Sequence, residues 1–66
     1  MQGNKLRYYE AIRDYIIDAG ARREALSDEM RDFDPTEIDS LFKPMREAQR
    51  HLLEQVEGQI ERLRNA

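Results

Sequence analysis

The sequence predicts an all-α protein in which two helices of similar length fold back on each other as an antiparallel hairpin. Two apolar stripes run along the 66-residue chain, and an Asp34-Pro35 breaker separates them near its midpoint. Their apolar residues recur in steps of three and four, the spacing that places side chains on one face of an α-helix. Each stripe needs an apolar partner, and the other stripe is the nearest one available.

The first helical arm is expected to cover about residues 5–33. Asn4 precedes it and is an acceptable N-cap residue. The stripe of this arm consists of Tyr9, Ile12, Ile16, Ala19, Arg23, Leu26, Met30 and Phe33. An alternative remains open at Gly20, where a left-handed cap would end one helix and give a three-helix bundle. The stripe keeps its phase across Gly20, which favours a continuous helix that Gly20→Ala would stabilise.

The second arm follows a turn at residues 34–35 and is expected to cover about residues 35–64. Asp34 as N-cap, Pro35 at the first helical position and Glu37 three residues after the cap form a helix start signal. Pro44 is expected to kink this arm rather than break it, because the apolar phase continues past it. The stripe consists of Ile38, Phe42, Met45, Gln49, Leu52, Val56, Ile60 and Leu63.

The small size of the chain predicts that it forms a homodimer. A domain of this length buries only about 60% of the surface of its unfolded chain. The absence of cysteine excludes disulfides, and a lone His51 excludes the usual Cys/His zinc sets. Further apolar residues, among them Leu41 and Ala48, lie outside both stripes, and one hairpin cannot cover them all. We therefore expect two hairpins to pack into a four-helix bundle. The expected core and dimer residues are Tyr9, Ile12, Ile16, Leu26, Met30, Phe42, Met45, Leu52, Val56 and Ile60.

Charge and hydropathy predict a small acidic protein of the cytoplasm. The net charge is -3, and residues 26–44 form an acidic belt with two basic and six acidic groups. The longest apolar run is Tyr15-Ile16-Ile17, so no membrane span or secretory signal is expected. The lack of cysteine fits a reducing compartment.

The first arm carries the candidate partner-binding residues, which are Arg7, Tyr8, Arg13, Tyr15 and Ile17. Tyrosine and arginine are enriched among the residues that dominate binding energy at protein interfaces. This composition predicts a regulatory or adaptor protein that binds another protein. The alternative is an RNA- or DNA-binding regulator, in which arginine contacts phosphates and tyrosine stacks on bases. In architecture alone, an acidic helical-hairpin dimer is similar to the plasmid copy-number regulators, which bind RNA. The negative net charge favours the protein partner.

Neither catalysis nor a cofactor is expected. Ser27 and Ser40 have no neighbouring base in their own segments, and His51 has no partner set for nucleophilic chemistry. The acidic belt lacks the central glycine and terminal glutamate of a calcium loop. Glu47, His51 and Glu54 share a helical face, but the Glu-x-x-His pairs of dimetal bundles are absent. The sequence therefore predicts a non-enzymatic protein without a metal.

Overall fold

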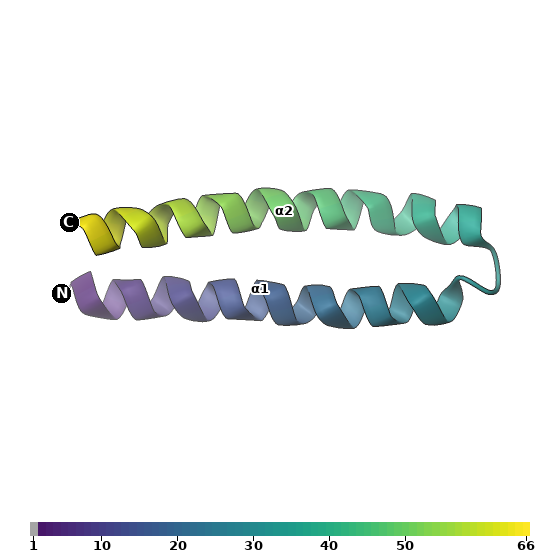
Figure 1. Ribbon diagram of the computed structural model, residues 1–66, viewed down its shortest axis with the longest axis horizontal. Coiled ribbons are helices and arrows are strands. Elements are labelled where there is room, and N and C mark those ends of the chain that lie inside the picture. The colour runs from purple at the N-terminus through teal and green to yellow at the C-terminus, as the bar shows by residue number, and fades with distance from the viewer. Residues whose placement is uncertain (1) are drawn as a thin grey trace.

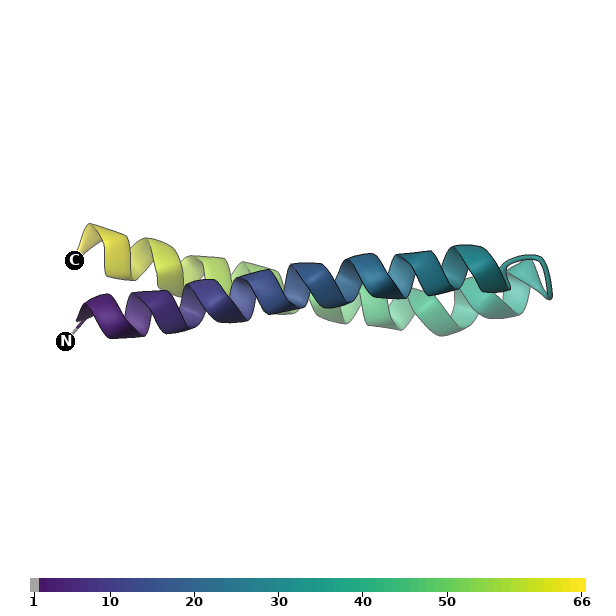
Figure 2. The same ribbon diagram turned by 90° about the horizontal axis from the view of Figure 1, so that it is seen from below.

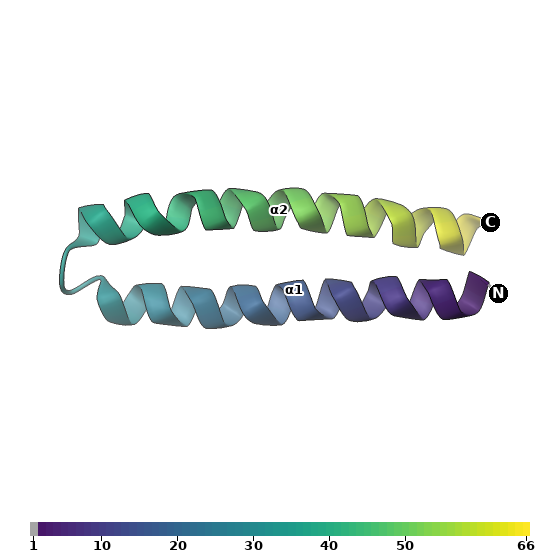
Figure 3. The same cartoon turned by 180° about the vertical axis from the view of Figure 1, so that it is seen from behind.

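The protein is a hairpin of two long helices. The computed structural model describes residues 2–66 and contains α1 (Gln2–Met30) and α2 (Pro35–Asn65), joined by a turn at residues 31–34. The helices run antiparallel, and the two ends of the chain lie together at the end opposite the turn (Figure 1; seen from behind in Figure 3). The rod measures 50 × 15 × 11 Å. The predicted helical hairpin is confirmed.

The start of α2 follows from the Asp34-Pro35 pair. Asp34 has extended backbone angles (φ -156°, ψ 93°), and its Oδ1 accepts a hydrogen bond of 3.2 Å from the backbone N–H of Glu37. Pro35 opens the helix at a position where no N–H is needed. Pro44 lies inside α2, which continues through it. At the other end, Arg62 and Arg64 occupy the last turn, where positive charge favours the helix dipole.

The first helix begins and ends earlier than the sequence pattern predicts. It starts at Gln2, so Asn4 is a helical residue and not the N-cap. It ends at Met30, whose carbonyl accepts a 3.0 Å hydrogen bond from the N–H of Phe33 in the turn. Gly20 lies inside α1, and no glycine of the described residues has a positive φ. The three-helix alternative is therefore wrong, because Gly20 is not a left-handed cap.

The two helices cross at a shallow angle near mid-length (Figure 2). Gly20 of α1 is buried there against Gln49 of α2. A Cβ atom on Gly20 would lie 2.7 Å from Cδ of Gln49, closer than side chains pack. Gly20 therefore serves the close approach of two helices rather than the end of one.

The interhelical seam differs from the one that hydropathy predicts. The most deeply buried side chains are Ile38, Phe42, Ile60 and Ser27. The seam residues of α1 are buried or half-buried and comprise Leu6, Tyr9, Arg13, Ile16, Gly20, Arg23, Ser27 and Met30. Their steps are again three and four, but Arg13, Gly20 and Ser27 replace Ile12, Ala19 and Leu26. Both helices are rotated relative to expectation, because the small residues allow the backbones to approach.

This rotation moves part of the expected core to the edge of the seam within one hairpin, while the role of these residues in a dimer stays a prediction. Leu26, Met45 and Leu52 are about half exposed, at 48%, 45% and 48%, and lie beside the seam rather than in it. Phe33, at the end of the expected first stripe, is 84% exposed in the turn. The other expected core residues, Tyr9, Ile12, Ile16, Met30, Phe42, Val56 and Ile60, are buried or half-buried. A single hairpin thus leaves large apolar side chains in solvent.

Candidate interaction surface

The two long sides of the hairpin carry different chemistry. Successive helical residues are rotated by about 100°, so the residues flanking the seam fall on one side or the other. One side holds the ion pairs that connect the helices, and we call it the ion-paired face. The other side is the apolar face. Its residues are Tyr8, Ile12, Tyr15, Ala19 and Leu26 of α1, and Leu41, Met45, Ala48 and Leu52 of α2.

Two ion pairs between the helices, and one between the turn and α2, define the ion-paired face. Near the chain ends, Arg64 Nη2 donates to Glu10 Oε2 at 2.9 Å. Near the turn, Arg31 Nη2 lies 3.4 Å from Asp39 Oδ1. Between them, Glu24 pairs with Arg46. Because these pairs span most of the rod, they fix the register of α1 against α2.

The Glu24 cluster is the most connected polar group between the helices. Arg46 Nε donates to both carboxylate oxygens of Glu24, at 2.9 and 3.1 Å, and its Nη2 lies 3.3 Å from the hydroxyl of the buried Ser27. Arg23 Nε approaches the same carboxylate at 3.3 Å. The hydrogen bonds from Arg46, and then those from Arg23, hold the pKa of Glu24 below its ordinary value. This cluster joins the helices but offers no open site for a ligand.

The apolar face has a groove at mid-length. Tyr15, Ala19, Met45, Ala48 and Leu52 line it, and its volume is about 310 Å³. Tyr15 is 72% exposed at its rim. The small side chains make the hollow, and the larger ones around them form its walls. Such a surface offers apolar contact and shape rather than catalytic groups.

Gln49 contributes an unsatisfied polar atom to this groove. Its side chain lines the hollow together with Arg23, and its Oε1 is buried without a hydrogen-bond partner among the described residues. Buried polar atoms in proteins are nearly always hydrogen-bonded, so an orphan oxygen marks a place where a donor from outside the hairpin is favoured.

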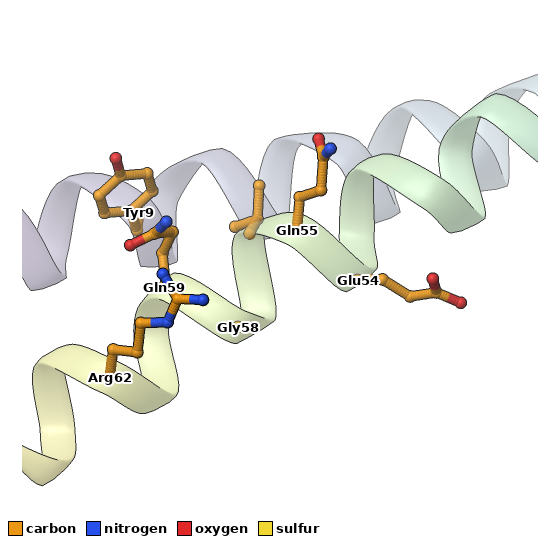
Figure 4. A pocket seen from close by; sticks show the side chains of 7 residues that line it. Tyr9, Glu54, Gln55, Gly58, Gln59 and Arg62 are labelled. Atoms are coloured by element: carbon orange, nitrogen blue, oxygen red, sulfur yellow. The ribbon is translucent and has the colours of Figure 1, made fainter.

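Near the chain ends, which form the open end of the hairpin opposite the turn, the apolar face becomes polar (Figure 4). A recess of about 460 Å³ lies between Tyr9 of α1 and Gln55, Gln59 and Arg62 of α2. In Figure 4, the side chains of Tyr9 and Gln59 lie next to each other, whereas Glu54 points away from α1. Charge and hydrogen-bonding groups are therefore available at this end.

The structure does not bring the five predicted partner-binding residues onto one surface. Tyr8 and Tyr15 belong to the apolar face, where both are strongly exposed. Arg13 and Ile17 lie towards the ion-paired face, and Arg13 donates two 3.1 Å hydrogen bonds to Asp14. Arg7 is exposed on the outer side of α1. Their role in partner binding stays a prediction, but the five residues do not form one patch.

Sequence reasoning did not single out Glu24, Arg46 and Ser27. A signal for two of them exists: Glu24 and Arg46 lie almost equally far from the turn on opposite arms, as do Arg31 and Asp39. In an antiparallel hairpin such positions face each other. No comparable signal marks Ser27, whose burial depends on how far each helix is rotated.

Neither described helix contains an apolar stretch long enough to cross a membrane. Within residues 2–66, no three His, Asp or Glu side chains gather in a way that would hold a metal ion. No family model, curated protein or solved structure matches the chain. The groove and the exposed apolar side chains make the apolar face the candidate functional surface.

Proposed function

We propose that this chain is a small non-enzymatic regulatory or adaptor protein that acts through protein–protein contacts as a homodimer. In this dimer the apolar faces of two hairpins pack together into a four-helix bundle, an assembly in which short helical hairpins bury their remaining apolar surface. The observation that supports the proposal best is the apolar face itself, which the hairpin leaves in solvent.

The surface area of the hairpin supports a partner of matching size. The accessible surface is 5313 Å² for a chain of 7.9 kDa. A compact monomer of that mass exposes about 4,400 Å², so the hairpin carries an excess of about 900 Å². A stable protein interface buries about 800 Å² on each partner. One further hairpin is therefore enough to cover the excess.

The composition of the apolar face supports a protein partner. Tyr15 and Met45 line the central groove, and Tyr8 is exposed further along the same face. Aromatic residues and methionine are enriched at interface cores. Isolated exposed apolar residues need no explanation, but a continuous patch along both helices is typical of interaction sites. In such a dimer Tyr8 and Tyr15 contact the second copy, which leaves Arg7, Arg13 and Ile17 for a further protein.

Replacing each of two alanines by glutamate tests the proposal. Ala48 lines the central groove, whereas Ala25 is exposed on the outer side of α1. Ala48→Glu places a carboxylate in the proposed interface and should abolish dimerisation in sedimentation equilibrium, while Ala25→Glu should leave the dimer intact. Circular dichroism checks that both variants remain helical. A wild-type protein that stays monomeric at millimolar concentration would overturn the proposal.

Nucleic acid is the alternative partner, and it has a distinct signature. Binding of a fluorescently labelled RNA hairpin or DNA duplex by the wild-type protein should weaken steeply as salt rises. The structure gives this alternative little support, because Arg13 is paired with Asp14 and Arg22 with Asp18. Salt-sensitive binding that is lost in an Arg7→Ala, Arg13→Ala variant would replace the protein-contact proposal.

A further inference from the structure

The charges of the hairpin are distributed unevenly along its length. The turn end, residues 26–44, carries two basic and six acidic groups, a net charge of -4. The open end, residues 1–14 with 56–66, carries five basic and four acidic groups, a net charge of +1. The rod thus has an acidic end and a weakly basic end.

From this polarity, and resting on the proposed dimer, we infer that the second copy packs on the apolar face in the opposite orientation. The turn of each copy then lies over the open end of the other. In the same orientation two acidic ends would lie side by side, and like charges in contact oppose association. In the opposite orientation each acidic end meets the weakly basic end of its partner.

The twofold axis of this arrangement passes through the central groove. Each helix then packs antiparallel on its own counterpart, and residues equally distant from the middle of a helix face each other. Met45 meets Leu52 of the second copy. In α1 the same axis is level with Gly20, which lies against Gln49.

Glu37 and Arg62 are the charged residues that this symmetry brings together. They are exposed and lie 25 residues apart on α2, about seven helical turns, so they share one side of the helix. Within one hairpin they are separated by about 38 Å. Across the proposed dimer, Glu37 of each copy faces Arg62 of the other, which gives two symmetric ion pairs at the two ends of the bundle.

The same axis passes close to Gln49. Each copy has a buried Gln49 Oε1 without a partner at the floor of its groove. The opposite orientation brings the two Gln49 residues to the same level, and rotation of each amide out of the seam lets its Nε2–H reach the Oε1 of the other. The dimer thereby supplies the donor that the single hairpin lacks.

Charge reversal tests the orientation directly. Glu37→Arg and Arg62→Glu should each weaken dimerisation, by about five- to tenfold in Kd at low salt. The double variant restores both pairs with exchanged signs, so it should dimerise more tightly than either single variant. Because the two positions are too far apart to interact within one hairpin, any rescue must act between copies.

Arg64 provides the matched control for this cycle. It lies in the same last turn of α2 but bonds Glu10 on the ion-paired face. Glu37→Arg combined with Arg64→Glu should show additive losses and no rescue. Additive losses for Glu37→Arg with Arg62→Glu as well would overturn the inferred orientation.

A distance measurement separates this inference from the proposed function. The chain contains no cysteine, so Asp32→Cys in the turn gives a single site for a spin label. Pulsed electron paramagnetic resonance should place the two labels about one rod length apart, near 50 Å. A separation near one interhelical spacing, about 10 Å, would show a dimer in the same orientation and overturn the inference alone. A monomer would overturn the proposed function instead.

Discussion

Gly20 and Gln49 meet in the seam at the place where α1 and α2 cross. The space between them is too small for any side chain larger than the hydrogen atom of glycine. A Cβ on Gly20 would come within 2.7 Å of Gln49 Cδ. Gln49 nevertheless leaves its own Oε1 without a partner among the described residues. The crossing point thus combines tight packing between the helices with an unsatisfied polar atom, and both properties have measurable consequences.

The Gly20 layer should show coupling in a double-mutant cycle. Gly20→Ala alone should stabilise the helix by less than its propensity gain, because the methyl group displaces the flexible amide end of Gln49 from the seam. In the Gln49→Ala background the same substitution should stabilise by about 1 kcal/mol, the helix-propensity gain of alanine over glycine. The expected coupling is at most about 1 kcal/mol, at the lower end of the range for residues in contact. Urea denaturation at one fixed protein concentration measures it, and equal effects of Gly20→Ala in both backgrounds would contradict the contact.

The two phenylalanines should differ sharply in their contribution to stability. Phe42 is 5% exposed in the core, and Phe33 is 84% exposed in the turn. Phe42→Ala should cost about 3 to 5 kcal/mol, which is enough to unfold a hairpin of this size. Phe33→Ala should change stability by less than about 0.5 kcal/mol. Far-ultraviolet circular dichroism distinguishes them, and a large loss for Phe33→Ala would favour the seam that hydropathy predicts over the observed one.

The N-cap of α2 should contribute measurably to stability. Asp34→Ala removes the acceptor for the backbone N–H of Glu37 and should cost about 1 kcal/mol. Asp32→Ala is the control, because Asp32 is also an exposed aspartate of the turn but caps no helix. Thermal denaturation of both variants at equal concentration gives the comparison. Equal melting temperatures for the two variants would argue against the capping role.

The Glu24–Arg46 pair should make stability depend on pH in the acidic range. Arg46 lowers the pKa of Glu24 in the folded protein, whereas in the unfolded chain the pKa of this carboxyl group is about 4.3. The stabilisation is therefore fully present above the unfolded pKa and is lost as pH falls through the folded pKa. Glu24→Gln should be less stable than wild type at neutral pH, and the difference should shrink below about pH 4.

The matched control for this titration is Glu47→Gln, which removes an exposed carboxylate from α2. Its stability should follow wild type across the same pH range. Denaturant midpoints at constant ionic strength provide the measurement. A constant difference between Glu24→Gln and wild type from pH 3 to pH 7 would exclude the ion pair as its cause.

The sequence predicts the hairpin well because its signals are local. Asp34, Pro35 and Glu37 specify the start of α2, and the periodic apolar residues specify two long helices. The rotation of the helices about their axes is a tertiary property. Leu26 is far more apolar than Ser27, yet the observed seam contains Ser27, because a small side chain allows α1 to approach Arg46 and Gln49. Hydropathy ranks residues by transfer energy and does not register this steric preference.

Because hydropathy does not register the rotation of the helices, it also could not predict which residues form the candidate interaction surface. The composition shows more apolar residues than one hairpin can cover, which predicts a second copy. Which of these residues stay exposed depends on which residues form the seam. Tyr8 and Tyr15 were predicted as partner contacts together with Arg13, which the structure places towards the opposite side of the rod. If the assumed seam is one residue away from the observed seam, residues from two different surfaces are combined in one predicted patch.

Most of the exposed apolar side chains lie on one flank, with Ile17 and Phe33 as the exceptions, and this has a consequence for assembly size. Once two hairpins have covered each other, the outward flanks present mainly salt-linked arginines and carboxylates, with Ile17 as an isolated exposed apolar residue. No second continuous apolar surface then remains for a third hairpin. Growth therefore terminates at a pair, and neither sheets nor filaments should form as concentration rises.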